Sequence, residues 1–175
     1  WQGGSSILMA AVLKARGVTD RKVWVVDSFE GCPKPDAEAY PQDASDRHHT
    51  FTNLQVSLQK VSSNFADFGL LGPQVEFVRG WFRDSMYSER VEAIESLALL
   101  RLDGDLYQST IEALRGGYYK VSVGGVVIVD DWRLDGMQAR QAVIDFHQEC
   151  NIPDEIRVAS DGLAWWTKGA PSDCG

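Results

Sequence analysis

Two short apolar runs that each end in carboxylates constrain most strongly what this chain folds into. Leu99–Leu102 is followed by Asp103-Gly104-Asp105, and Val126–Val129 is followed by Asp130-Asp131, with one helix's length of sequence between them. Runs of this kind are typical of fully buried strands of a parallel sheet at the point where each strand leaves the core. Two such strands predict an acidic rim at the carboxyl ends of the strands, where open α/β sheets bind ligands.

The clustered carboxylates favour a divalent cation at this rim. Carboxylate oxygens gathered at one point repel one another unless a proton or a hard cation lies among them, and magnesium is the usual ion. A single acid at a strand end is often only a helix cap, so capping and solvated turns are the alternative interpretation. Acids at two strand ends, separated by one crossover, favour a metal or catalytic role.

The composition predicts one globular domain that acts on a small molecule or a protein. The chain has 175 residues, 44% of them hydrophobic, which is enough for one substantial core. A formal charge of -8 and a pI near 4.8 provide no basic surface for a nucleic acid. Cys32, Cys150 and Cys174 form no CxxC pair, which favours a reducing, cytoplasmic setting without disulfides. No stretch suits a membrane span, and no signal peptide opens the chain.

The first 27 residues predict half of a nucleotide-binding unit. The loop Gly3-Gly4-Ser5-Ser6 precedes a run of helix formers at 7–16, which Gly17 ends, and a strand at 22–27 ends in Asp27. Glycines let a ligand approach the backbone, and the serines are expected to cap a helix whose amides attract negative groups. An acid at the end of this strand accepts hydrogen bonds from ribose hydroxyls. The alternative is an ordinary helix cap and turn.

The chain begins at Trp1 with what is already a glycine loop, so we expect the preceding strand to be absent from this sequence. The polar segment from Ser28 to Thr50 is long for a connection and is typical of a lid or a binding loop. Its pair His48-His49 is a candidate for substrate contact or for a base, with solvated loop histidines as the alternative.

The middle of the chain predicts another helix and strand. Val75–Arg79 alternates apolar and polar residues and predicts a strand that ends at Gly80. The following Trp81 and Phe82 are candidates for stacking against a flat base, with core packing as the equal alternative. Apolar residues at helical spacing predict a core-facing helix before Gly69: Leu54, Leu58, Val61 and Phe65.

The remaining elements alternate helix and strand. Gly124-Gly125 is expected to turn the chain into the second acidic strand. Strands at 155–159 and 163–168, joined by the hairpin signal Asp161-Gly162, predict an antiparallel end of the sheet. Three further helices are expected at 88–98, 106–120 and 138–150, with Ile111, Leu114, Ala142, Val143 and Phe146 facing inward.

Several motifs in order resemble the macrocin O-methyltransferase family, from the first residue to about the final hairpin. The resemblance implies one class I methyltransferase domain over 1–175. This fold has a Rossmann-like sheet that is mostly parallel, with a C-terminal antiparallel hairpin and helices on both faces. It implies S-adenosylmethionine as methyl donor and magnesium as cofactor. The motifs are Trp1-Gln2-Gly3-Gly4-Ser5, Trp24-Val25-Val26-Asp27-Ser28-Phe29-Glu30-Gly31, Gly80-Trp81-Phe82, Leu100-Arg101-Leu102-Asp103-Gly104-Asp105-Leu106-Tyr107 and Ile128-Val129-Asp130-Asp131.

The resemblance also implies how the donor is held. Asp27 would bind the ribose, and Trp81 with Phe82 would border the adenine. Residues 115–119 and Val123 depart from the family's usual residues between the two acidic strands, which bears on local packing rather than on the metal site. The full donor-binding set that the motifs imply is Gly3, Gly4, Ser5, Ser6, Asp27, Ser28, Phe29, Gly80, Trp81 and Phe82.

The metal site that the resemblance implies contains Asp103, Asp130 and Asp131, and Asp105 is a neighbour that the motif does not exclude. Family members methylate sugar hydroxyls of natural products such as macrolides and aminocoumarins. The hypothesis is that magnesium lowers the pKa of the attacked hydroxyl and that Asp103 accepts its proton as general base. The expected partner is a small glycosylated molecule, with no nucleic acid or membrane, and a homo-oligomer is compatible with the sequence.

Two other functions fit the same kind of sheet. A nicotinamide-dependent oxidoreductase is disfavoured by the absence of GxGxxG and by the acid-rich rim. A non-catalytic binding protein would retain the fold and use the acids only as caps.

Overall fold

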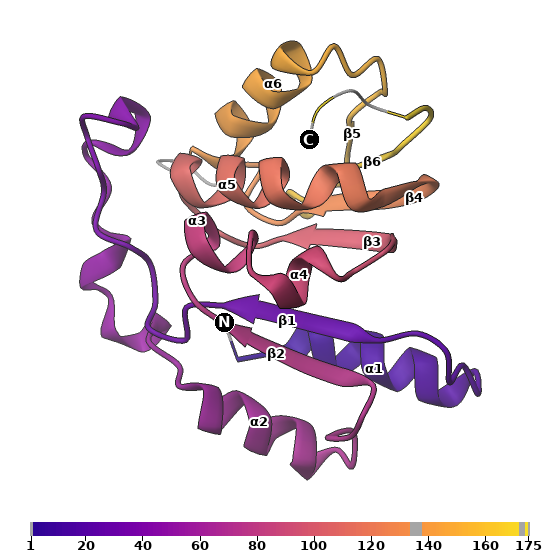
Figure 1. The fold of residues 1–175 in the computed structure, drawn as a ribbon. Helices are drawn as coiled ribbons and strands as arrows, with labels where there is room; N and C mark the ends of the chain where they lie inside the picture. Colours follow the sequence, from indigo (N-terminus) through magenta and orange to yellow (C-terminus); the bar gives the residue numbers. More distant parts are fainter. Residues whose placement is uncertain (1, 134–137, 172–173, 175) are drawn as a thin grey trace. The chain divides into compact units, whose positions relative to one another are not determined.

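The computed structural model describes residues 2–133, 138–171 and 174, and these form two compact units (Figure 1). Unit 1 consists of Trp1–Pro33 and His48–Trp81, and unit 2 consists of Lys34–Arg47 and Phe82–Gly175. The expectations of a single domain and of a missing first strand stay predictions. Trp1, which opens the first motif, lies outside the described residues.

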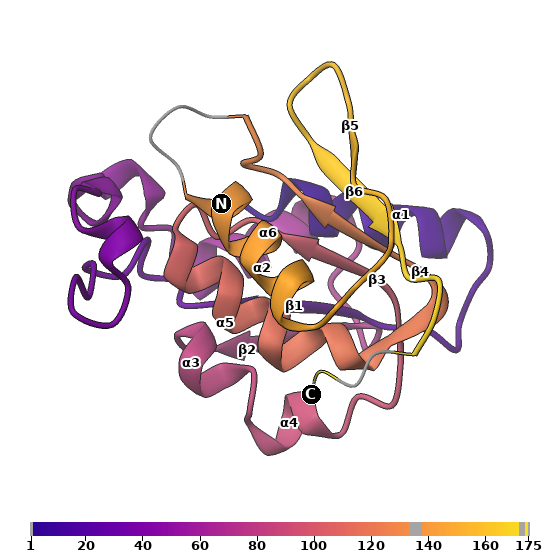
Figure 2. The same ribbon diagram turned by 90° about the horizontal axis from the view of Figure 1, so that it is seen from above.

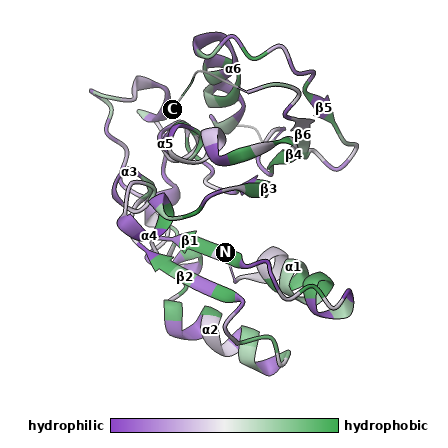
Figure 3. Cartoon of the chain, turned by 45° about the vertical axis from the view of Figure 1, so that its right-hand side comes forward, coloured by the Kyte–Doolittle hydropathy of each residue, from purple (hydrophilic) through white to green (hydrophobic). Residues whose placement is uncertain are grey.

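Unit 1 is built on a parallel strand pair with helices packed against it. Strands β1 (Val23–Asp27) and β2 (Val75–Arg79) are in register along their whole length, and both end at the same edge. Helices α1 (Gly4–Ala15) and α2 (Leu58–Asp67) complete a core that contains Val61 and Phe65. Figure 3 shows the hydrophobic strand β1 beside β2, in which hydrophobic and hydrophilic residues alternate. The helices and strands predicted for this part of the chain are therefore present.

Unit 2 contains a four-stranded sheet in the order β3-β4-β6-β5. Strands β3 (Leu97–Leu102) and β4 (Val121–Val129) are parallel, whereas β5 (Arg157–Val158) and β6 (Ala164–Thr167) form the predicted antiparallel hairpin. Figures 1 and 2 show helices α5 (Tyr107–Gly117) and α6 (Ala139–Glu149) side by side on one face of this sheet. The inward-facing residues predicted for these helices are all buried: Ile111, Leu114, Ala142, Val143 and Phe146.

Short elements complete both units. Four 3-10 turns occur at η1 (Pro41–Asp43), η2 (His48–Thr50), η3 (Thr52–Leu54) and η4 (Tyr118–Lys120). Helices α3 (Phe82–Ser85) and α4 (Glu89–Glu92) precede β3. No helix among the described residues combines the length and the hydropathy that crossing a membrane requires.

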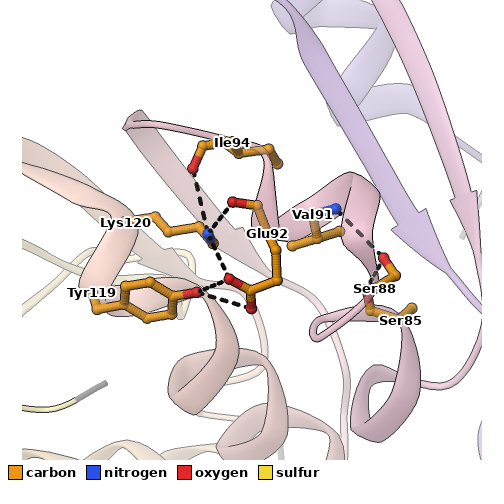
Figure 4. Close-up of polar contacts among 7 residues, drawn as sticks. All are labelled: Ser85, Ser88, Val91, Glu92, Ile94, Tyr119 and Lys120. Carbon is orange, nitrogen blue, oxygen red and sulfur yellow. Dashed lines mark hydrogen bonds and ion pairs between the residues drawn. The ribbon is translucent and has the colours of Figure 1, made fainter.

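The prediction of a helix over 88–98 is wrong beyond its first turn. Ser88 caps α4 by accepting a hydrogen bond from the amide of Val91, but the helix ends at Glu92. The Lys120 ammonium donates to the carbonyl oxygens of Glu92 (3.1 Å) and Ile94 (3.4 Å), as Figure 4 shows. A lysine from η4 thus accepts the role that amides of a continuing helix would have had, as hydrogen-bond donor to these carbonyls. From Leu97 onward the backbone is a strand, β3.

Two predictions about the acidic strands need correction. The first strand is not fully buried: Leu102, at its end, is 4% exposed, but Leu99 is 36% exposed. The pair Gly124-Gly125 lies inside β4 rather than before it, at a register shift in the pairing with β3. A Cβ on Gly125 would meet the Ser122 carbonyl oxygen at 2.8 Å, so only glycine fits this irregularity.

The serines do not cap α1. Gly3 is the N-cap residue, and its φ of 87° is a left-handed conformation that suits glycine. A capping serine would instead need an extended backbone at this position. Ser5 and Ser6 lie in the first turn of the helix.

The prediction of a chain without disulfides is also wrong. Cys150, at the end of α6, and Cys174 form a disulfide bond. A spacing of 24 residues without a CxxC motif gives no local sign that these two segments meet. Cysteine usage therefore no longer supports a reducing compartment.

The glycines at 116 and 117 let another segment approach α5 closely. A Cβ on Gly116 would lie 2.5 Å from the Cβ of Met86, which is 5% exposed. In an open helix, alanine is more stable than glycine by about 1 kcal/mol.

We therefore expect Gly116→Ala to destabilise the protein instead, by about 1–3 kcal/mol, because the added methyl overpacks the contact with Met86. Urea unfolding followed by circular dichroism measures the change. Gly72→Ala is the control, since a Cβ there meets nothing within 4 Å, and its stability should stay close to that of the wild type. A Gly116→Ala variant as stable as the wild type would contradict this packing.

Candidate active site

The ends of β3 and β4 bring the four predicted acids to one edge of the sheet. Leu102 pairs with Val129 at the last position of the parallel ladder, and the amide of Asp130 donates to the Leu102 carbonyl at 3.0 Å. Both strands therefore leave the sheet at the same level. The two loops that follow carry Asp103 and Asp105 on one side and Asp130 and Asp131 on the other.

Three of these carboxylates form a cluster with the geometry of a cation site. One oxygen from each of Asp103, Asp105 and Asp131 lies within 4.8 Å of the other two. Asp105 reaches this position through a left-handed backbone (φ 59°), and its amide donates to Asp131 Oδ2 at 3.3 Å. Asp103 is exposed, whereas Asp131 is 7% exposed.

Asp130 is held differently in this structure. The Arg101 guanidinium donates through one nitrogen to Asp130 and through the other to Asp103 Oδ2, at 2.7 Å for the latter. The three-carboxylate cluster is thus Asp103, Asp105 and Asp131, whereas Asp130 lies outside it and pairs with Arg101 through one oxygen. Its role as a metal ligand stays a prediction.

The electrostatics of the cluster favour the binding of positive charge. Burial, and after it the negative charges of Asp105, Asp103 and Asp130, together raise the pKa of Asp131 to about 7. Burial also raises the pKa of Asp130, and the Arg101 guanidinium opposes the increase. A proton or a cation at the cluster therefore relieves both desolvation and mutual repulsion.

The donor set suits magnesium. All three clustered groups are carboxylates, which are hard oxygen ligands, and no histidine or cysteine belongs to the cluster. The residues present therefore fit the metal that the motifs imply.

The predicted donor-binding loop lies at the start of α1 in unit 1. Gly3 has φ 87°, and a Cβ there would lie 2.9 Å from Val61 Cγ1, so packing already requires glycine at this position. A Cβ on Gly4 would meet nothing within 4 Å, which leaves its backbone open to close approach by a ligand. Ser5 and Ser6 follow in the first turn, where helix amides favour negative groups.

Asp27 ends β1 and organises the turn after it. Its Oδ1 accepts hydrogen bonds from the amide of Phe29 at 2.6 Å and from the Ser28 hydroxyl at 3.5 Å. The amide of Gly80, just after β2, donates to the backbone carbonyl of Asp27 at 2.9 Å. Asp27, Ser28 and Gly80 therefore lie together at the carboxyl ends of the two strands. Phe29 is buried against Phe77 and packs in the core of unit 1.

The aromatic pair after Gly80 is divided between the two units. Trp81 is the last residue of unit 1, whereas Phe82 begins α3 and packs against the core of unit 2. His48 and His49 lie in η2, and His48 packs edge-on against Phe51. The roles predicted for the aromatic pair and the histidines stay predictions.

Two residues near the acidic loops were not singled out from the sequence. Arg101 stands two positions before Asp103 on the same strand face, and an arginine within an apolar strand was a usable signal. Asp43 is 1% exposed, and its carboxylate accepts hydrogen bonds from the amides of Tyr107 and Gln108 at 2.8 Å each. No local pattern connects it with residues 64 positions away.

The parallel strands with acids at their ends and the antiparallel final hairpin define a class I methyltransferase fold. The model of the macrocin O-methyltransferase family (TylF) matches residues 1–168, and the chain belongs to this family. The solved structure of the O-methyltransferase NovP superposes with a TM-score of 0.91 at 39% identity, covering 97% of this chain and 69% of that one. The calicheamicin methyltransferase CalS11 superposes with a TM-score of 0.67 at 18% identity, covering 93% and 68%, which supports the fold.

The chain is also similar to three curated O-methyltransferases. It is 44% identical to the 8-demethyl-8-(2,3-dimethoxy-alpha-L-rhamnosyl)-tetracenomycin-C 4'-O-methyltransferase of Streptomyces olivaceus. It is 42% identical to the demethyldecarbamoylnovobiocin O-methyltransferase of Streptomyces niveus and 40% identical to the mycinamicin III 3''-O-methyltransferase of Micromonospora griseorubida. Each match covers 94% of this chain but only 62%, 62% and 65% of the respective relatives.

The raised pKa of Asp131 predicts a pH dependence of stability in the absence of divalent cations. The group titrates near 3.8 when unperturbed and at about 7 in the folded protein, so the folded state binds the extra proton between these values. The free energy of unfolding should fall as pH rises through this window, and Asp131→Asn should remove that part of the decrease.

Urea unfolding in the presence of EDTA, measured at several pH values for wild type and variant, tests this prediction. Asp20→Asn, which replaces an exposed acid in the loop before β1, is the control and should retain the wild-type pH profile. Parallel profiles for the wild type and Asp131→Asn would show that Asp131 does not carry the proton.

Proposed function

We propose that this protein is a magnesium-dependent O-methyltransferase that transfers a methyl group from S-adenosylmethionine to a sugar hydroxyl of a glycosylated natural product. The observation that carries the proposal is the cluster of Asp103, Asp105 and Asp131 at the ends of β3 and β4. Membership of the macrocin O-methyltransferase family and the names of the relatives support the reaction and the substrate class, of the macrolide or aminocoumarin type. Because the relatives are named for natural products of this kind, we include a role in antibiotic biosynthesis in the proposal.

The proposed donor site uses the loops at the carboxyl ends of β1 and β2. Gly4 offers an open backbone at the start of α1, and Asp27 is the acid that would hold the ribose hydroxyls. Trp81 and Phe82 would border the adenine ring through their aromatic faces. Ser5, Ser6, Ser28, Phe29 and Gly80 complete the proposed donor-binding set with Gly3.

The proposed metal ligands are Asp103 and Asp131, with Asp105 as the third carboxylate of the cluster. When bound, the cation would lower the pKa of an acceptor hydroxyl, which is otherwise a poor nucleophile near neutral pH. Asp131 supplies a buried anionic ligand, and its raised pKa means that cation binding displaces a proton below about pH 7. Asp130 is the further proposed ligand, since its ion pair with Arg101 uses only Oδ2.

Asp103 is the proposed general base. It is the exposed member of the cluster and therefore the one that an acceptor hydroxyl reaches from solvent. Arg101 holds one of its oxygens, Oδ2, at 2.7 Å, which fixes the orientation of the carboxylate while it accepts the proton. Aligning the hydroxyl with the donor methyl would supply much of the acceleration, since orientation contributes roughly 7–11 kcal/mol in well-aligned reactions.

We also place the reaction in the cytoplasm. The cysteines do not support this location, because Cys150 and Cys174 form a disulfide.

Replacing Asp103 with Asn should leave S-adenosylmethionine binding intact and reduce methyl transfer by at least a hundredfold, because the amide accepts no proton. Isothermal calorimetry measures donor binding, and transfer of a labelled methyl group to a panel of glycosylated macrolides and aminocoumarins measures turnover. EDTA should abolish turnover by the wild type, and magnesium should restore it.

Asp20→Asn is the matched control, because it removes an exposed acid before the amino end of β1, the end opposite Asp27. Wild-type turnover in Asp103→Asn would rule out the base, and turnover that ignores EDTA would rule out the metal. Binding of NAD in place of S-adenosylmethionine would favour the oxidoreductase, and binding of neither would favour a non-catalytic protein.

A further inference from the structure

Asp43 makes a helix cap from a remote part of the chain. Its side chain is buried, and both carboxylate oxygens accept hydrogen bonds from the first two residues of α5, Tyr107 and Gln108, at 2.8 Å each. The N-cap residue of α5, Leu106, makes no side-chain capping bond. Asp43 therefore satisfies two amides that would otherwise lack a partner at the start of this buried helix.

A second set of contacts holds the same segment on α5. We call Lys34–Arg47 the strap. The Tyr40 ring packs 6.2 Å from the Tyr107 ring, and the Tyr40 hydroxyl donates to Glu112 Oε1 at 3.5 Å. The Tyr40 side chain also packs against the core of unit 2. The strap is thus fixed along the first two turns of the helix, with Asp43 at its N-terminal end.

The helix that Asp43 caps begins directly after the acidic loop. Asp105 has φ 59°, a left-handed conformation that costs a non-glycine residue about 1 kcal/mol or more. The loop is tight, with the Leu106 amide donating to the Gly104 carbonyl at 2.6 Å. A residue remains in such a conformation only when its surroundings hold both ends of the turn.

The two ends of this turn are held by different elements. On one side β3 anchors Leu102 in the sheet, two residues before Gly104. On the other side the Asp43 carboxylate holds the amides of Tyr107 and Gln108, beginning two residues after Asp105. Asp43 lies outside the carboxylate cluster but fixes one boundary of the loop that presents Asp105 to it.

We propose that Asp43 is a positioning residue for the cation site: by docking the strap on α5, it holds Asp105 in the conformation that brings its carboxylate to Asp103 and Asp131. The inference rests on the proposed function, because it assumes that these three residues bind a divalent cation. It predicts that a substitution in the strap, 60 positions before Asp103 in the chain, changes cation affinity.

A merely structural cap would affect stability alone, and the chain offers a control for that case. Ser88 caps α4 in the same unit by accepting a hydrogen bond from the Val91 amide at 3.4 Å, and it also donates to the Ser85 carbonyl at 2.7 Å (Figure 4). Removing either cap destabilises the protein, typically by 0.5–2 kcal/mol. Of these two caps, it is Asp43 that caps the helix directly after the acidic loop.

The test measures Mn²⁺ binding by electron paramagnetic resonance, without donor or acceptor, in wild type, Asp43→Asn, Asp43→Ala and Ser88→Ala. We expect the dissociation constant to rise at least tenfold in Asp43→Ala. Asp43→Asn retains the size and one acceptor oxygen, so it should fold and show an intermediate increase. Ser88→Ala should bind Mn²⁺ within twofold of the wild type even when its melting temperature falls.

The possible results distinguish a failure of this inference from a failure of the proposed function. Wild-type Mn²⁺ affinity in both Asp43 variants would overturn the positioning role and leave the metal site intact. Equal weakening in Ser88→Ala would also overturn it, since general destabilisation would then explain the effect. Absence of Mn²⁺ binding by the wild type would reject the metal of the proposed function together with this inference. Hydrogen exchange at the amides of Tyr107 and Gln108, faster in Asp43→Asn, would identify the loosened helix start.

Discussion

The site depends on the in-register parallel pairing of β3 and β4. Because Leu102 and Val129 end the ladder opposite each other, the acids that follow them emerge at the same level. A shift of the register by one residue would reverse the facing of one strand's side chains and separate the carboxylates. The bulge around Gly125 absorbs an irregularity earlier in β4, so the last four residues of the two strands pair without interruption.

This pairing creates a local excess of negative charge that the protein only partly compensates. The guanidinium of Arg101 pairs with two of the four carboxylates, Asp103 and Asp130. Asp131 receives a hydrogen bond from the Asp105 amide, and burial together with the neighbouring negative charges raises its pKa. Clustered carboxylates repel one another, and a bound cation relieves this repulsion. Without a cation, such a cluster tends to hold a proton instead.

The sequence could predict what is determined locally. Strand ends, the final hairpin around Asp161-Gly162 and the buried faces of α5 and α6 follow from residue periodicity and turn chemistry. What it could not predict depends on partners distant in the chain: the Asp43 cap on α5, the Cys150–Cys174 disulfide, and the Lys120 bonds that accompany the early end of α4. The Arg101–Asp130 pair could be predicted only in part. The sequence shows an arginine within an apolar strand, but it does not show which acid the arginine pairs with.

The unequal exposure of the clustered acids suggests how binding and reaction are divided among them. A buried carboxylate such as Asp131 gains most from a cation, because water solvates it poorly. An exposed carboxylate such as Asp103 gains less from the same ion, but it remains accessible to a substrate hydroxyl. Asp105 combines intermediate burial with a left-handed backbone, so its position depends on the turn that holds it. The three chemically identical groups are therefore suited to different roles by their surroundings, and an acceptor would approach from the side of Asp103.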